Sequence, residues 1–130
     1  MIRKEVILYG IDNYSMIIEN ITEDLKKNEE YFDIKLILTE ALTNAFKHGN
    51  NSEKTKPIRL SYFYYGQTVC FEIEDTNVNK SSINIPDEID EYSILNESGR
   101  GLYLIKVLSD EIEIRNNILI IKKIIHNITN

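Results

Sequence analysis

Apolar and polar residues alternate along five short stretches of the chain, which is the pattern of half-buried β-strands. The predicted strands cover residues 2–9, 57–65, 68–75, 111–115 and 118–126. Gly66-Gln67 and Asn116-Asn117 supply two-residue turns, so the second strand should pair with the third and the fourth with the fifth.

Apolar residues at helical spacing fill most of the remaining chain. The predicted helices are one that begins after Asp12 or Asn13 and runs to about Asn28, one over residues 31–48, and a short one over residues 101–109. Gly49 and Asn50 supply a stop signal for the second helix. The order β, α, α, β, β, long loop, α, β, β predicts an α+β two-layer sandwich, a mixed and mostly antiparallel sheet with helices on one face. We expect residues 1–130 to form one domain.

Composition excludes several classes of protein and of site. The formal net charge of −6 argues against direct binding of nucleic acid, which needs a clustered basic surface. Cys70 is the single cysteine, so no intramolecular disulfide forms, and it is either a small core residue or a half-exposed thiol. No apolar run approaches the length of a membrane span, and the N-terminal run is too short for a signal peptide. We therefore expect a cytoplasmic protein without a membrane partner.

The second predicted helix carries polar residues along the edge of its apolar arc. The arc consists of Ile34, Ile37, Leu38, Ala41, Leu42 and Ala45. Asn44 and His48 lie between this arc and Glu40, and Asp33 lies near them two turns earlier. Asn offers a neutral oxygen to a hard cation, and Glu accepts a proton from a nucleophile. The alternative is an ordinary amphipathic helix with polar edge residues, in which His48 flanks the helix end.

The third predicted strand ends with a carboxylate on its apolar face, at Asp75. A buried carboxylate is costly without a partner, so a ligand N–H group is one explanation. The other is a turn in which Asp75 accepts the backbone N–H of Asn77 or Val78. Asn77 and Asn79 follow at alternate positions, and asparagine is the residue after glycine that best tolerates the left-handed region.

A glycine pair precedes the last predicted helix, in the stretch Glu97-Ser98-Gly99-Arg100-Gly101. Two glycines at a helix start let backbone N–H groups approach a phosphate, and Arg100 would add a charge-assisted contact. The alternative is a loop-to-helix turn in which glycine only satisfies the geometry. The stretch is neither a Walker A sequence nor a Rossmann fingerprint.

The order of these motifs resembles that of one family. TEALTNAFKHGN, residues 39–50, resembles the N box of the histidine-kinase-like ATPase superfamily, which has the Bergerat ATP-binding fold. EDTNVN, residues 74–79, falls where that family has its first glycine box, and SGRGLYLIKVLSDEIEI, residues 98–114, resembles the second. The sequences of these motifs are most similar to those of the stand-alone anti-sigma factor serine/threonine kinases.

The resemblance implies a role for each matching residue. Glu40 would be the general base and Asn44 the ligand of Mg²⁺. Asp75 would accept a hydrogen bond from the adenine amino group, and residues 76–98 would form the lid over ATP. The implied nucleotide-binding residues are Asn44, His48, Asp75, Asn77, Asn79, Gly99, Arg100, Gly101 and Leu102.

The implied activity is ATP- and Mg²⁺-dependent phosphorylation of a serine or threonine on a small anti-anti-sigma (STAS-type) partner, with a sigma factor as a second partner. Two alternatives stay open: a nucleotide-binding protein that holds its partner without phosphorylating it, and a nucleotide-free interaction module. Because Asn77 and Asn79 replace glycine beside the expected base, we predict weaker nucleotide binding than in a relative with both glycines. The aromatic run at residues 62–65 is a packing feature or, through its outward rings, a surface for a partner or a homodimer.

Overall fold

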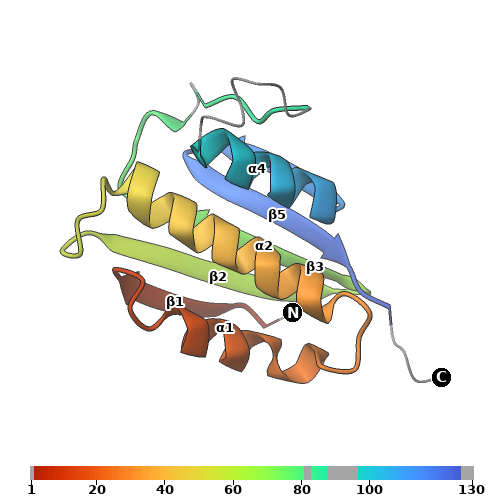
Figure 1. Ribbon diagram of the computed structural model, residues 1–130. Helices are drawn as coiled ribbons and strands as arrows, with labels where there is room; N and C mark the ends of the chain where they lie inside the picture. Colours follow the sequence, from red (N-terminus) through yellow and green to blue (C-terminus); the bar gives the residue numbers. More distant parts are fainter. Residues whose placement is uncertain (1, 81–82, 88–96, 127–130) are drawn as a thin grey trace.

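A five-stranded sheet forms one layer of the molecule in the computed structural model, which describes residues 2–80, 83–87 and 97–126 (Figure 1). The strands are β1 (Lys4–Tyr9), β2 (Pro57–Tyr65), β3 (Thr68–Glu74), β4 (Glu111–Arg115) and β5 (Ile118–Ile124). Their order across the sheet is β1-β2-β3-β5-β4, and every neighbouring pair is antiparallel. The five predicted strands are confirmed. Both predicted turns are also present, with positive φ at Gly66, Asn116 and Asn117.

Helices cover one face of this sheet, with α2 in the middle between α1 and α4 (Figure 1). The helical elements of the described residues are α1 (Tyr14–Thr22), the 3₁₀ turn η1 (Glu23–Leu25), α2 (Tyr31–Asn44), the π-helical turn η2 (Ala45–Gly49) and α4 (Glu97–Leu108). This arrangement confirms the predicted α+β two-layer fold. None of the helices in the described ranges is long and apolar enough to cross a membrane.

Three helix boundaries differ from the prediction: the end of α1, the start of α4 and the end of α2. The first α-helix ends at Thr22 rather than near Asn28, and the chain continues as the 3₁₀ turn. The hydroxyl of Thr22 donates to the carbonyl oxygen of Ile18 at 2.7 Å, a local bond that competes with regular helix geometry. The last helix begins at Glu97, so it includes the glycine pair that the sequence placed before it.

The apolar arc of α2 supplies the centre of the core. All six residues of the predicted arc are buried, and they pack with inward side chains of the central strands such as Leu60, Phe71 and Ile121. Burying this much apolar surface in one face is the main force that holds the helices on the sheet. Cys70 is also buried, as expected of a small core residue and not of a half-exposed thiol. Burial raises the pKa of its thiol.

The end of α2 is not a regular α-helix. After Asn44 the chain makes a π-helical turn, which closes where the backbone N–H of Asn50 donates to the carbonyl oxygen of Ala45 at 2.9 Å. The expected α-helix to residue 48 is therefore four residues too long. Single π turns within helices are frequent at functional sites, and this one carries His48 and Gly49.

Candidate functional site

A narrow notch lies where α2 and α4 meet, and we call it the rim notch. It is lined by Glu40, Thr43, Asn44, His48 and Gly101 and holds about 10 Å³, roughly the space of one water molecule. A Cβ atom on Gly101 would lie 3.2 Å from a carboxylate oxygen of Glu40, so the absence of a side chain lets α4 approach this carboxylate closely. The structure thus brings together four of the predicted residues from segments that are distant in the sequence, namely Glu40, Asn44, His48 and Gly101.

A second space, the inner cavity, lies between α2, β3 and the segment after β3. It encloses about 40 Å³. Its polar lining consists of Asn44, His48, Asp75, Asn77 and Lys80, and its apolar lining includes Ala41, Ile73, Ile83, Leu102 and Leu119. Asn44 and His48 line both the rim notch and the inner cavity, so the two spaces adjoin.

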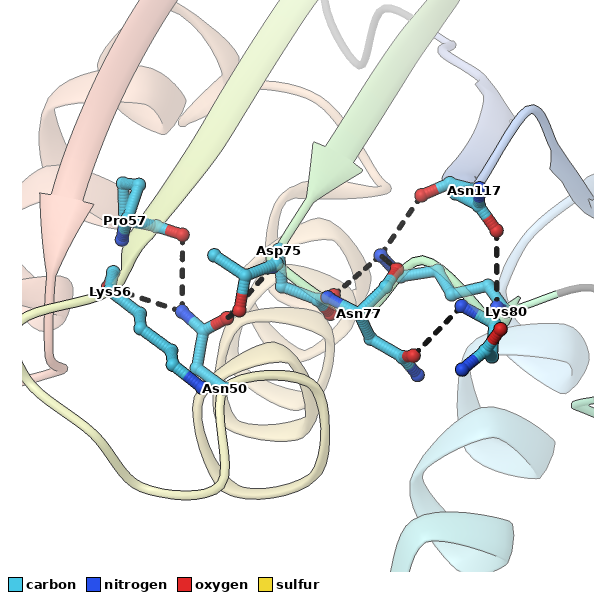
Figure 2. A network of polar contacts seen from close by, with 9 residues as sticks. Asn50, Lys56, Pro57, Asp75, Asn77, Lys80 and Asn117 are labelled. Atoms are coloured by element: carbon cyan, nitrogen blue, oxygen red, sulfur yellow. Dashed lines mark hydrogen bonds and ion pairs between the residues drawn. The ribbon is translucent and has the colours of Figure 1, made fainter.

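Asp75 already has partners within the chain. Its side chain is 5% exposed and forms an ion pair with Lys80, whose Nζ lies 2.5 Å from Asp75 Oδ1 (Figure 2). The same oxygen accepts the backbone N–H of Asn77 at 2.8 Å. The turn that the sequence offered as an alternative for Asp75 is therefore present. Sequence reasoning missed Lys80, although a buried carboxylate needs a cation and Lys80 is the nearest basic residue along the chain.

Gly49 is required by the position of Asp75 rather than by the end of the helix alone. A Cβ atom on Gly49 would lie 1.9 Å from Asp75 Oδ2 and 2.1 Å from its Cγ, far inside van der Waals contact. The φ angle of Gly49 is not positive, so the requirement is one of space. The carboxylate of Asp75 consequently packs directly on the backbone of the π turn.

Asn77 and Asn79 serve the turn in a different way from the one expected. Neither is among the described non-glycine residues with positive φ, which are Asn51, Ser52, Asn116 and Asn117. Instead, Asn77 Oδ1 accepts the backbone N–H of Asn79 at 2.9 Å, in the same pattern by which Asp75 accepts that of Asn77. The expectation of left-handed backbone is wrong here, because two successive Asx turns direct the chain without it.

Asn50, which the sequence offered only as part of a stop signal, connects three elements of the site. Its side chain is fully buried, and its amide nitrogen donates to the carbonyl oxygens of Lys56 and Pro57 at 3.2 and 3.1 Å. Its Oδ1 accepts the backbone N–H and the hydroxyl of Thr76 at 2.8 and 2.7 Å. Figure 2 shows this amide between the start of β2 and the end of β3. The sequence holds no signal for this role beyond the position of Asn50 after Gly49.

The glycine pair lies inside α4 and not before it. Gly99 and Arg100 are in the first turn of the helix, and Gly101 and Leu102 follow in the second. Leu102 is buried and lines the inner cavity, whereas Arg100 is exposed. Gly99, Arg100 and Asn79 line neither space. The prediction of a loop before the helix is wrong because contacts of Gly101 and Leu102 with α2 and the core stabilise helical backbone despite the low propensity of glycine.

Asp33 does not join the other polar residues of α2. Its carboxylate lies 3.9 Å from Nζ of Lys123 in β5. It lines neither the rim notch nor the inner cavity. The predicted lid is described only in part: residues 81–82 and 88–96 lie outside the described ranges. In the described part of the lid, the backbone N–H of Ile83 donates to the carbonyl oxygen of Lys80 at 2.9 Å, and Asp87 pairs with Lys106 of α4.

Two groups of residues have ligand atoms for a metal ion. In the rim notch, Glu40 and Asn44 offer the carboxylate and carboxamide oxygens that Mg²⁺ accepts, so the chemistry of these residues fits the ion. The second group, Glu29, Glu30 and His126, has ligand atoms within 4.8 Å of one another. There, the Glu30 carboxylate accepts the backbone N–H of His126 and lies at the start of α2, where a negative charge is favourable. The second group is therefore explained as a structural contact.

Comparison with known proteins agrees with this geometry. Residues 15–123 match the family described as histidine kinase-like ATPase domain. The chain is 30% identical over 94 residues to the serine-protein kinase RsbW of Oceanobacillus iheyensis, covering 68% of this chain and 60% of that protein. It is 29% identical over 92 residues to RsbW of Bacillus licheniformis, covering 64% and 56%, and 26% identical over 88 residues to RsbW of Listeria monocytogenes, covering 63% and 56%.

These matches span a little over half the length of each relative, whereas the family match covers most of the present chain. The family match runs from within α1 to within β5, and so it includes every residue that lines the rim notch and the inner cavity. The chain belongs to the histidine kinase-like ATPase domain family.

Proposed function

We propose that the chain binds ATP with Mg²⁺ and phosphorylates a serine or threonine on a STAS-type anti-anti-sigma partner. The observation that carries this proposal is the rim notch, where Glu40 and Asn44 of α2 face Gly101 of α4 beside an inner cavity that contains Asp75. The similarity to serine-protein kinases supports the same reaction class.

Glu40 is the proposed general base. The hydroxyl oxygen of the partner would attack the γ-phosphorus of ATP while the bond to the β,γ-bridging oxygen breaks, and Glu40 would take the hydroxyl proton, leaving ADP and the phosphorylated partner. Asn44 would hold Mg²⁺ through its side-chain oxygen, and the ion would offset the negative charge of the phosphates. The half-buried position of both side chains keeps them at the edge of the core, where a substrate can still reach them.

The remaining predicted residues would bind the nucleotide at two ends. Asp75 and Leu102, which line the inner cavity, would contact the base, with Asn77 and His48 beside it. Gly99, Arg100 and Gly101 would lie along the phosphates, where the first turn of α4 offers favourable potential. Asn79 would act through the turn that it forms with Asn77.

A second candidate function is an interaction module that does not transfer phosphate. The specific observation in its favour is the state of the inner cavity, which encloses about 40 Å³ and contains the Asp75–Lys80 ion pair. For comparison, an engineered apolar cavity of about 150 Å³ binds benzene. A base would therefore have to move side chains before it could enter.

Calorimetric titration with ATP and MgCl₂, followed by incubation with a STAS-type protein and γ-labelled ATP, separates the two functions. We expect binding and transfer in the unmodified protein. Glu40→Gln should retain binding and lower transfer by about 10²- to 10⁴-fold. Glu23→Gln is the matched control, because Glu23 is exposed and lies in η1, away from the site. Binding without transfer would favour an interaction module that still binds nucleotide, and no binding at millimolar nucleotide would leave only the nucleotide-free interaction module.

The proposed protein partners can be tested separately from the chemistry. We propose that the chain also binds a sigma factor and forms a homodimer. Light scattering after size-exclusion chromatography, with the chain alone and after addition of a sigma factor, measures both associations. A monomer mass at high micromolar concentration would reject the homodimer, and an unchanged elution with the sigma factor would reject that partner.

A further inference from the structure

Lys80 is a buried cation whose ammonium group is fully used by the chain itself. Its side chain is 6% exposed, and its Nζ lies 2.5 Å from Asp75 Oδ1, 2.9 Å from the carbonyl oxygen of Asn117 and 3.3 Å from that of Asn77. An ammonium group has three N–H donors, so these three oxygens satisfy it completely. Figure 2 shows Lys80 between Asp75 and the turn that carries Asn117.

The backbone around Lys80 is held independently of its ammonium group. The backbone N–H of Lys80 donates to Asn117 Oδ1 at 3.1 Å, and its carbonyl oxygen accepts the N–H of Ile83. Asn117 is fixed in turn by the β4–β5 hairpin, where it has positive φ. A change of the Lys80 side chain should therefore alter the ion pair while the path of the backbone is retained.

Asp75 Oδ1 is occupied by these contacts. It accepts both the ammonium of Lys80 and the backbone N–H of Asn77, while Oδ2 packs against Gly49. A base that donates an N–H group to this carboxylate would compete with a charge-assisted hydrogen bond, which is about twice as strong as a neutral one. Lys80 also lines the inner cavity, so its side chain takes part of the space that the base would enter.

We propose that Lys80 is an internal ligand of Asp75, which a nucleotide must displace to place its base in the inner cavity, and that Lys80 thereby sets the affinity of the site for the base. This inference rests on the proposed nucleotide binding. The expected change in nucleotide affinity is opposite to the one that charge alone predicts. Removing a positive charge near a polyanion should weaken binding by simple electrostatics, whereas removing Lys80 should strengthen it.

The test is calorimetric titration of Lys80→Met with ADP and MgCl₂. Methionine has a similar length and no charge, so the carboxylate of Asp75 is left for the ligand. We expect ADP to bind about 10- to 100-fold more tightly than to the unmodified protein, the range expected from one hydrogen bond to a charged group. Lys80→Arg keeps the charge and should retain the weak binding. Lys26→Met, in which an exposed lysine directly after η1 is lost, is the control for the change in net charge.

A second titration tests whether the effect of Lys80 on affinity depends on the base of the nucleotide. Magnesium tripolyphosphate has no base, so its affinity should be equal in Lys80→Met and Lys26→Met. If Lys80→Met does not fold, Lys80→Gln is used, because glutamine keeps a hydrogen-bond donor while losing the charge. Equal or weaker ADP binding in a folded, uncharged Lys80 variant would overturn the inference and leave the proposed function standing. No ADP binding in any variant would overturn both.

Discussion

The rim notch and the inner cavity, the two ends of the candidate site, differ in how deeply their carboxylates are buried. At the rim notch, Glu40 and Asn44 are half-buried and a glycine of α4 leaves space beside them. At the inner cavity, Asp75 is almost fully buried and its charge is balanced by Lys80. A half-buried carboxylate retains water as a partner, but a buried one needs a partner from the protein whenever no ligand is there. The base end of the site therefore needs a compensating charge from the chain itself, whereas the rim does not.

Among the variants of the site, Asn50→Ala should cause the largest loss in the free energy of unfolding. The change removes four hydrogen bonds of a fully buried side chain, so the carbonyl oxygens of Lys56 and Pro57 and the backbone N–H and hydroxyl of Thr76 lose this partner. We expect the free energy of unfolding to fall by about 3–4 kcal/mol, measured by urea denaturation. Asn20→Ala, at an exposed position of α1, is the control for composition. A loss below about 1 kcal/mol would show that water replaces these bonds.

Gly49→Ala tests the inner cavity directly. The new Cβ atom would lie 1.9 Å from Asp75 Oδ2, so the carboxylate must move and the ion pair with Lys80 must change. We expect a loss of about 2 kcal/mol in the free energy of unfolding, together with a change in ADP affinity measured by calorimetry. An unchanged stability would contradict the close packing of Asp75 on the π turn.

Gly101→Ala is the matching change at the rim notch. Here the new Cβ atom would lie 3.2 Å from the end of the flexible Glu40 side chain, which can shift by a few tenths of an ångström. Because alanine favours helix by about 1 kcal/mol over glycine, we expect stability to be unchanged or slightly higher. Phosphate transfer should nevertheless decrease, since Glu40 is displaced. If both alanine variants lost stability equally, the contrast between the two ends would be wrong.

Asn77→Gly should have the smallest effect. It removes the Asx turn in which Asn77 Oδ1 accepts the N–H of Asn79 and adds backbone freedom, which costs about 0.5–1 kcal/mol of stability. It also removes side-chain volume from the lining of the inner cavity, so ADP should bind a few-fold more tightly. Asn84→Gly, at an exposed position of the same segment, controls for the added freedom alone. Weaker ADP binding would show that Asn77 itself contacts the ligand.

The sequence predicted the periodic parts of the fold well because burial on one face leaves a direct trace in the residue pattern. The strands of both hairpins and all six residues of the apolar arc of α2 were predicted from alternation and helical spacing alone. The polar edge of α2 also placed Glu40 beside Asn44 correctly, since that position depends only on local helix geometry. The start of α4 was missed, because contacts with α2 outweigh the low helix propensity of Gly99 and Gly101.

The sequence by itself determined the order of the elements, the inward face of each and the motifs that identify the family. Only the tertiary structure decided how the carboxylate of Asp75 is balanced. Its partners are Lys80 and Asn77 nearby and Gly49 from the π turn η2, and Asn117 of the last hairpin anchors Lys80. Periodicity records whether a residue is buried, but hydrogen bonds and charges are satisfied by whichever groups the fold brings within about 3 Å.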